Sequence, residues 1–105
     1  MTIGEFRDSI VNGQVPAGLG HALVALWHDA HGDWNMAHKL AQDDEGIDGS
    51  RVHAYLHRKE GDDSNARYWY ARAKQPPAMD TLEEEWANLV KEFLNRTTTN
   101  GTGAE

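Results

Sequence analysis

The feature that most constrains the fold is a Gly-Asp pair that occurs twice, at Gly32-Asp33 and again at Gly61-Asp62. Glycine readily adopts the left-handed conformation that ends a helix, and an aspartate that follows it can cap the next helix. When the sequence is shifted so that one pair falls on the other, further pairs of identical residues coincide in the flanking segments. They include Ala25 with Ala54, His28 with His57, and Ala37 with Ala66. We therefore predict two helical hairpins in tandem.

Helices are predicted on both sides of each Gly-Asp pair and at both ends of the chain, because apolar residues recur there at intervals of three and four. Thr81 and Glu84 form a capping-box sequence at the start of the most regular segment, which runs from Leu82 to Arg96. No segment alternates with the period of a strand, so we expect an all-α fold. The predicted helices are 3–11, 19–31, 34–44, 50–60, 63–74 and 82–96.

We expect a single helical domain over residues 1–96 and a disordered tail over residues 97–105. From Thr97 onward only Thr, Asn, Gly, Ala and Glu remain, and these residues cannot build a hydrophobic core. A short N-terminal helix and a C-terminal capping helix flank the two hairpins. Because two hairpins leave exposed the face that a third would cover, we expect the helix of 82–96 to pack across the second hairpin and shield it.

The chain is acidic, with 10 basic and 17 acidic residues and a formal net charge of −7. This charge argues against duplex nucleic acid and against an anionic membrane as partners. The absence of cysteine excludes disulfides, thiolate metal sites and a cysteine nucleophile. Residues 1–15 include Glu5, Arg7 and Asp8 and so contain no uninterrupted apolar stretch for export, from which we expect a cytoplasmic protein.

Six histidines suggest a metal site. His53 and His57 are four residues apart and share a helix face, and Glu60 lies three residues further along it. A zinc site needs three or four such ligands, at about 2.0–2.1 Å for nitrogen. Ala54, however, stands where a His-Glu-x-x-His motif requires its glutamate. The alternative is that the histidines pack between helices. We expect no cofactor, and keep zinc at His53, His57 and Glu60 as the alternative.

A second candidate site is cationic and aromatic. Arginine binds carboxylate or phosphate through two parallel hydrogen bonds, and aromatic rings stack on planar ligands. The residues proposed to bind an anionic ligand are Arg58, Arg67, Tyr68 and Arg72. The alternative is that these arginines pair with acidic residues of neighbouring helices and contribute to packing alone.

The segments around the two Gly-Asp pairs resemble tetratricopeptide and Sel-type repeats. In the first unit the resemblance is carried by Ala25-Leu26-Trp27, Gly32-Asp33-Trp34 and Ala37. In the second it is carried by Ala54-Tyr55-Leu56, Gly61-Asp62 and the run Ala66-Arg67-Tyr68-Trp69-Tyr70-Ala71-Arg72-Ala73. Residues 53–62, with Asn65-Ala66 and Tyr68-Trp69-Tyr70, also resemble a group of short bacterial proteins that have no assigned activity. The latter resemblance implies a fold but no function.

The chain contains no nucleophile motif and no phosphate-binding glycine loop. The leading hypothesis is therefore a non-enzymatic helical scaffold that binds a protein partner or itself. The alternative is a small enzyme or binding protein for an anionic or metal ligand, with one pocket formed by His53, His57, Arg58, Glu60 and Tyr68. Convergence of these side chains in an exposed cleft would favour the alternative, whereas burial of both histidines would favour the scaffold.

Overall fold

The computed structural model describes the backbone of residues 1–102 and the side chains of residues 1–96, and within this range the chain forms six helices and no strand. The all-α class predicted from the sequence is confirmed, with one helix for each predicted segment and ends that differ by a few residues. The helices are α1 (Ile3–Asn12), α2 (His21–Ala30), α3 (Trp34–Asp43), α4 (Ile47–Lys59), α5 (Asp63–Arg72) and α6 (Leu82–Thr102).

The two Gly-Asp pairs form the same turn. Gly32 and Gly61 have φ angles of 91° and 88°, in the left-handed region that a side chain would disfavour. Each aspartate then caps the following helix, Asp33 by accepting a hydrogen bond from the Met36 amide and Asp62 from the Asn65 amide. The turn chemistry expected from the sequence is therefore confirmed in the α2–α3 and α4–α5 connections. A tetratricopeptide-like arrangement of these two helix pairs stays a prediction.

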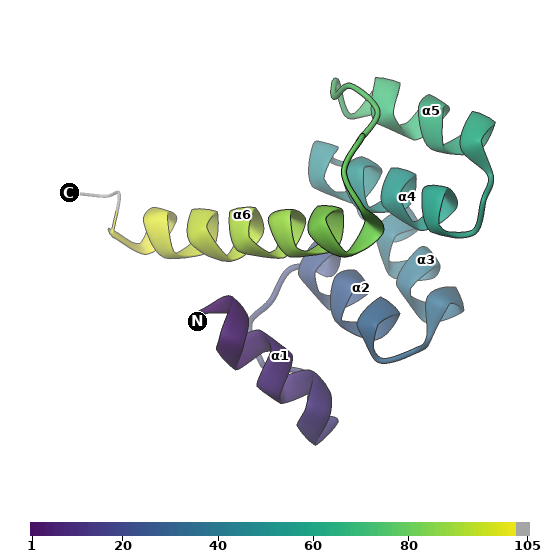
Figure 1. The fold of residues 1–105 in the computed structure, drawn as a ribbon. Coiled ribbons are helices and arrows are strands. Elements are labelled where there is room, and N and C mark those ends of the chain that lie inside the picture. Colours follow the sequence, from purple (N-terminus) through teal and green to yellow (C-terminus); the bar gives the residue numbers. More distant parts are fainter. Residues whose placement is uncertain (103–105) are drawn as a thin grey trace.

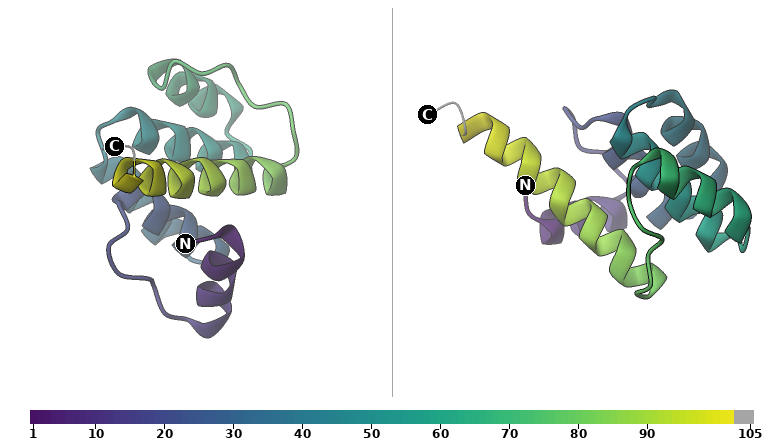
Figure 2. Two further views of the ribbon diagram at one scale, coloured as in Figure 1. Left: turned by 90° about the vertical axis from the view of Figure 1, so that its left-hand side faces the viewer. Right: turned by 90° about the horizontal axis from the view of Figure 1, so that it is seen from above.

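Helices α2 to α5 follow one another as a stack, in which α3 contacts α2 and α4, and the backbone of α5 lies close to α4 alone among the described helices (Figure 1). Helix α6 crosses one side of this stack and contacts α1, α2 and α4 (Figure 2). The predicted capping box is present at its start, where Glu84 N donates to Thr81 Oγ1 at 3.0 Å and Thr81 N donates to Glu84 Oε1 at 2.9 Å. None of the helices within the described residues combines the length and apolarity needed to cross a membrane.

The position of α6 agrees in part with the expectation that it would pack across the second hairpin, since it contacts α4 and its Glu85 accepts a hydrogen bond from Tyr70 of α5. However, α6 covers α2 and α4 and leaves the outer side of α5 free of any helix. Trp86 determines this position. Its indole Nε1 donates a hydrogen bond to the carbonyl of Leu26 at 3.0 Å, and this bond fixes α6 against α2. The structure also continues α6 to Thr102, beyond the predicted domain boundary at residue 96. Residues 103–105, the rest of the expected tail, lie outside the described residues.

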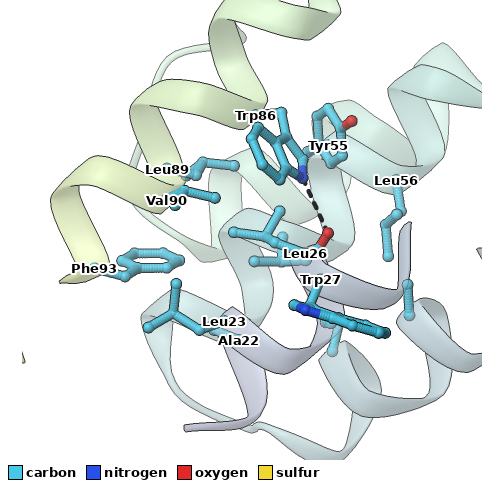
Figure 3. Packing of buried hydrophobic residues seen from close by; sticks show 14 of the residues in the cluster. Ala22, Leu23, Leu26, Trp27, Tyr55, Leu56, Trp86, Leu89, Val90 and Phe93 are labelled. Carbon is cyan, nitrogen blue, oxygen red and sulfur yellow. Dashed lines mark hydrogen bonds between the residues drawn. The ribbon is translucent and has the colours of Figure 1, made fainter. Parts of the chain in front are cut away.

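The main hydrophobic core lies between α6 and the helices beneath it. Leu26, Leu56 and Val90 are fully buried there, and Trp27, Tyr55 and Trp86 surround them (Figure 3). Phe6 brings α1 into the same core, whereas Val11 of this helix is 86% exposed. Helix α5 is held by a separate, smaller cluster of buried residues, namely Ala54, Ala66 and Tyr70. Its buried apolar contacts are therefore separate from the main core.

The α3–α4 connection depends on a close approach at Gly49. A Cβ atom built on this buried glycine would overlap the backbone carbonyl of Asp44, which cannot move away as a flexible side chain could. We expect Gly49→Ala to lower the free energy of unfolding by about 1–3 kcal/mol, measured by urea denaturation. Gly4→Ala is the matched control, because Gly4 also lies within a helix and a Cβ there would meet nothing closer than 3.7 Å. Equal stability of the two variants would contradict the expectation.

Candidate functional site

Three histidines from two neighbouring helices converge in the structure. His53 and His57, both on α4, meet His38 of α3, and one ring nitrogen from each lies within 4.8 Å of the other two. The Nε2 atoms of His38 and His53 are 2.8 Å apart, which is a hydrogen-bond distance. His53 and His57 are buried, at 3% and 7% exposure, and His38 is half-buried. We call these three residues the histidine cluster.

Two tryptophans hold the rings of the histidine cluster in place. The indole of Trp69, on α5, stacks on His53 with ring centroids 3.8 Å apart and planes 16° apart. Trp34, at the start of α3, stacks on His38 at 4.9 Å and 11°, and donates its own Nε1 proton to the carbonyl of Leu56 at 3.1 Å. Because both indoles are themselves packed, the imidazole planes have little freedom to rotate.

Burial lowers the pKa of two of the three histidines. Together with the neighbouring His38 and His57, it lowers the pKa of His53 to about 4. Burial also lowers the pKa of His38, as does the proximity of His57, while Glu60 acts in the opposite direction. His53 is therefore neutral at pH 7, and the pair of Nε2 atoms shares one proton. The Nδ1 atom of His53 is buried without a hydrogen-bond partner among the described residues, a cost of about 1–3 kcal/mol for a polar group of this kind.

Glu60 belongs to the same site but bonds a histidine rather than facing the cluster directly. Its Oε1 lies 2.6 Å from Nδ1 of His57, and because a carboxylate only accepts, Nδ1 is the donor; in the neutral ring the lone pair is then on Nε2. Of the predicted metal set, His53 and His57 therefore meet in the histidine cluster, whereas Glu60 reaches it only through its bond to His57. The structure also adds His38, which the sequence analysis did not select. The sequence did contain one indication of this role for His38. It follows Ala37, which coincides with Ala66 in the repeat and so was expected to lie where two helices touch.

The four residues predicted to bind an anion separate into two groups. Arg58 is engaged within the protein, since its Nη1 donates to Glu85 Oε1 at 2.8 Å and its Nη2 donates to the carbonyl of Asp80. The hydrogen bond to Glu85 raises the pKa of Arg58 above its ordinary value. Arg67, Tyr68 and Arg72 are exposed on α5 instead. Arg72 lies over the ring of Trp69 at 5.1 Å and donates to the hydroxyl of Tyr68 at 3.3 Å.

A groove that the sequence analysis did not anticipate lies where α1, α2, α4 and α6 meet. Its volume is about 580 Å³, and its walls include Ile10, Leu82 and Trp86, with Arg7 and Lys59 at its polar margin. None of the predicted site residues lines it. Sequence patterns gave no signal for this groove because its walls come from helices far apart in the chain.

No family model, curated protein or solved structure matches this chain. Functional inference therefore depends on the residues and geometry described above.

Proposed function

We propose that this protein is a non-enzymatic helical scaffold, and that it binds an acidic segment of a protein partner on the outer face of α5. We define this face by Arg67, Tyr68 and Arg72, which are spaced along one side of the helix and are all exposed. The side of α5 opposite to them carries the buried residues Ala66 and Tyr70, which pack against α4.

The observation that carries the proposal is the contrast between the cations of α4 and those of α5. Every arginine and lysine on α4 is paired with a carboxylate of the same chain: Arg51 with Glu92 at 2.5 Å, Arg58 with Glu85 at 2.8 Å, and Lys59 with Asp29 at 2.9 Å. Among the residues whose side chains the structure describes, no carboxylate lies within ion-pair distance of Arg67 or Arg72. These two guanidinium groups are available to carboxylates of another molecule.

The composition of the α5 face fits a peptide better than a nucleic acid. Tyrosine and arginine are the residues that most often dominate protein–protein interfaces, and Tyr68 is 53% exposed beside both arginines. Two arginines can each bind one carboxylate through paired hydrogen bonds, whereas binding to nucleic acid draws on many phosphate contacts. The net charge of −7 opposes a polyanion at long range, but ions screen that repulsion beyond about 8 Å at physiological salt.

The probe for this proposal is a fluorescein-labelled peptide rich in Glu and Asp with one aromatic residue, compared with the same peptide carrying Gln and Asn. We expect fluorescence anisotropy to show binding of the acidic peptide alone. Reversing both charges, in Arg67→Glu/Arg72→Glu, is expected to weaken binding at least tenfold, because two charge-assisted contacts become repulsive.

The matched control is Lys39→Glu/Lys91→Glu, which makes the same change of net charge at exposed cations on α3 and α6. It is expected to change peptide binding by less than about threefold, since charges beyond the Debye length are screened. An equal loss in the two double variants would assign binding to net charge and reject the α5 face. Tighter binding of a single-stranded oligonucleotide, or self-association that abolishes peptide binding, would also reject the proposal.

A further inference from the structure

We propose that the histidine cluster binds one divalent transition-metal ion, with Zn²⁺ the expected ion, through one ring nitrogen each of His38, His53 and His57. This site is separate from the α5 face, and neither proposal depends on the other. The sequence alone favoured packing for His53 and His57. The structure adds His38 of α3 to this pair, and so provides the third histidine ligand that the sequence analysis did not find.

The separations of the nitrogens suit a single ion. With Zn–N bonds of about 2.0–2.1 Å in tetrahedral geometry, ligand nitrogens lie roughly 3.3–3.4 Å apart. The Nε2 atoms of His38 and His53 are 2.8 Å apart, and all three ligand nitrogens lie within 4.8 Å of one another. An ion therefore requires the closest pair to open by about half an ångström and the third nitrogen to move inward. Half-buried His38 can shift most easily, by moving within its own plane parallel to the Trp34 indole, because the other two rings are buried.

The surroundings of the cluster prepare it for coordination. His57 donates its Nδ1 proton to Glu60, which leaves Nε2 as the ligand atom, and a histidine that binds metal commonly donates its second nitrogen to a carboxylate in this way. Trp34 and Trp69 stack on His38 and His53 and hold these rings in fixed planes.

The donor atoms define the class of ion. Three imidazole nitrogens suit Zn²⁺, Ni²⁺, Co²⁺ and Cu²⁺, whereas Mg²⁺ and Ca²⁺ require oxygen ligands. Three protein ligands leave a fourth coordination position for water or for a small exchangeable ligand. A second set of side chains, His57, Glu60 and Asp62, also lies close together, but Asp62 accepts hydrogen bonds from both the amide and the side chain of Asn65 as the cap of α5. The cluster of three histidines is therefore the better site.

The test uses the full chain without a purification tag, after removal of bound metal, and the probes are Zn²⁺ and Co²⁺ alone. We expect calorimetry to show one Zn²⁺ per chain, and Co²⁺ to give the intense visible absorption of tetrahedral coordination. His38→Gln is expected to weaken Zn²⁺ binding at least tenfold and to abolish the rise in melting temperature that Zn²⁺ causes in the unaltered chain. His38 is the variant of choice because its side chain is half-buried, so its replacement disturbs the core least.

The matched control is His28→Gln, another half-buried histidine that contacts a tryptophan, here Trp27, but lies outside the cluster. It is expected to leave Zn²⁺ affinity and the melting shift unchanged. Glu60→Gln tests the role of the carboxylate, and is expected to weaken binding by roughly tenfold to a hundredfold at unchanged stoichiometry. Equal losses in His38→Gln and His28→Gln, or the weak octahedral spectrum of Co²⁺ in the unaltered chain, would show adventitious binding to surface histidines and overturn the proposal.

Discussion

A chain that ends at Pro77 is expected to be largely unfolded. The truncation removes α6, which supplies a large share of the main core through Trp86, Leu89, Val90, Phe93 and Leu94, all 8% exposed or less. Burial of a side chain of this size contributes about 1.5–3 kcal/mol, so five of them contribute roughly 7–15 kcal/mol. The total stability of a small domain is about 5–15 kcal/mol. The free energy lost with α6 is therefore comparable to the total stability of the domain. Circular dichroism should show a loss of helix and no cooperative urea transition.

The control for this truncation is a chain that ends at Arg96. It lacks residues 97–105, which contain no apolar side chain larger than alanine, and so it retains all of the buried side chains named above. We expect its urea midpoint to match that of the full chain. A cooperative transition in the chain that ends at Pro77, with a midpoint near that of the full chain, would show that α6 is not needed for the fold.

The parts of the fold that the sequence predicted correctly are those determined by near neighbours in the chain. The Gly32-Asp33 and Gly61-Asp62 turns and the Thr81 capping box are formed by contacts over a few residues, and the chemistry of each residue type limits them to one geometry. The placement of α6 depends instead on which groove accepts Trp86. Apolar periodicity identifies the buried face of a helix but does not identify the helices it will cover.

The candidate site was predicted in part for the same reason. His53 and His57 share a helix face by spacing alone, and Glu60 follows from the same periodicity. His38 joins them only because of the rotation of α3 against α4, which no local pattern specifies. The pairing of Arg58 with Glu85 likewise requires α6 to lie beside α4. Arg67 and Arg72 remain exposed because α5 lies at the edge of the stack.

Two buried carboxylates accept hydrogen bonds from buried tyrosines, and these pairs make the stability of the fold depend on pH in the alkaline range. Asp29 accepts a hydrogen bond from the hydroxyl of Tyr55 at 2.9 Å and pairs with Lys59, while Glu85 accepts one from Tyr70 at 2.6 Å and pairs with Arg58. Burial raises the pKa of both phenols, and the adjacent carboxylates raise it further, against a smaller opposing effect of Arg58. Both hydroxyl groups therefore keep their protons in the folded state at pH values where an exposed tyrosine ionises.

The protein is accordingly expected to lose stability steeply above about pH 10, where tyrosines of the unfolded chain ionise. The unfolded state then binds fewer protons than the folded state. The contribution of each buried phenol, fully present below about pH 10, falls by about 1.4 kcal/mol per pH unit as pH rises toward the folded pKa. Tyr55 and Tyr70 together give about 2.7 kcal/mol per unit, enough to unfold a small domain within roughly two units.

Urea midpoints measured across this range should fall accordingly, and Tyr55→Phe/Tyr70→Phe should show a much shallower decline from a lower starting stability. Because lysines ionise in the same range in both proteins, identical slopes would assign the alkaline loss to those lysines and not to the buried tyrosines.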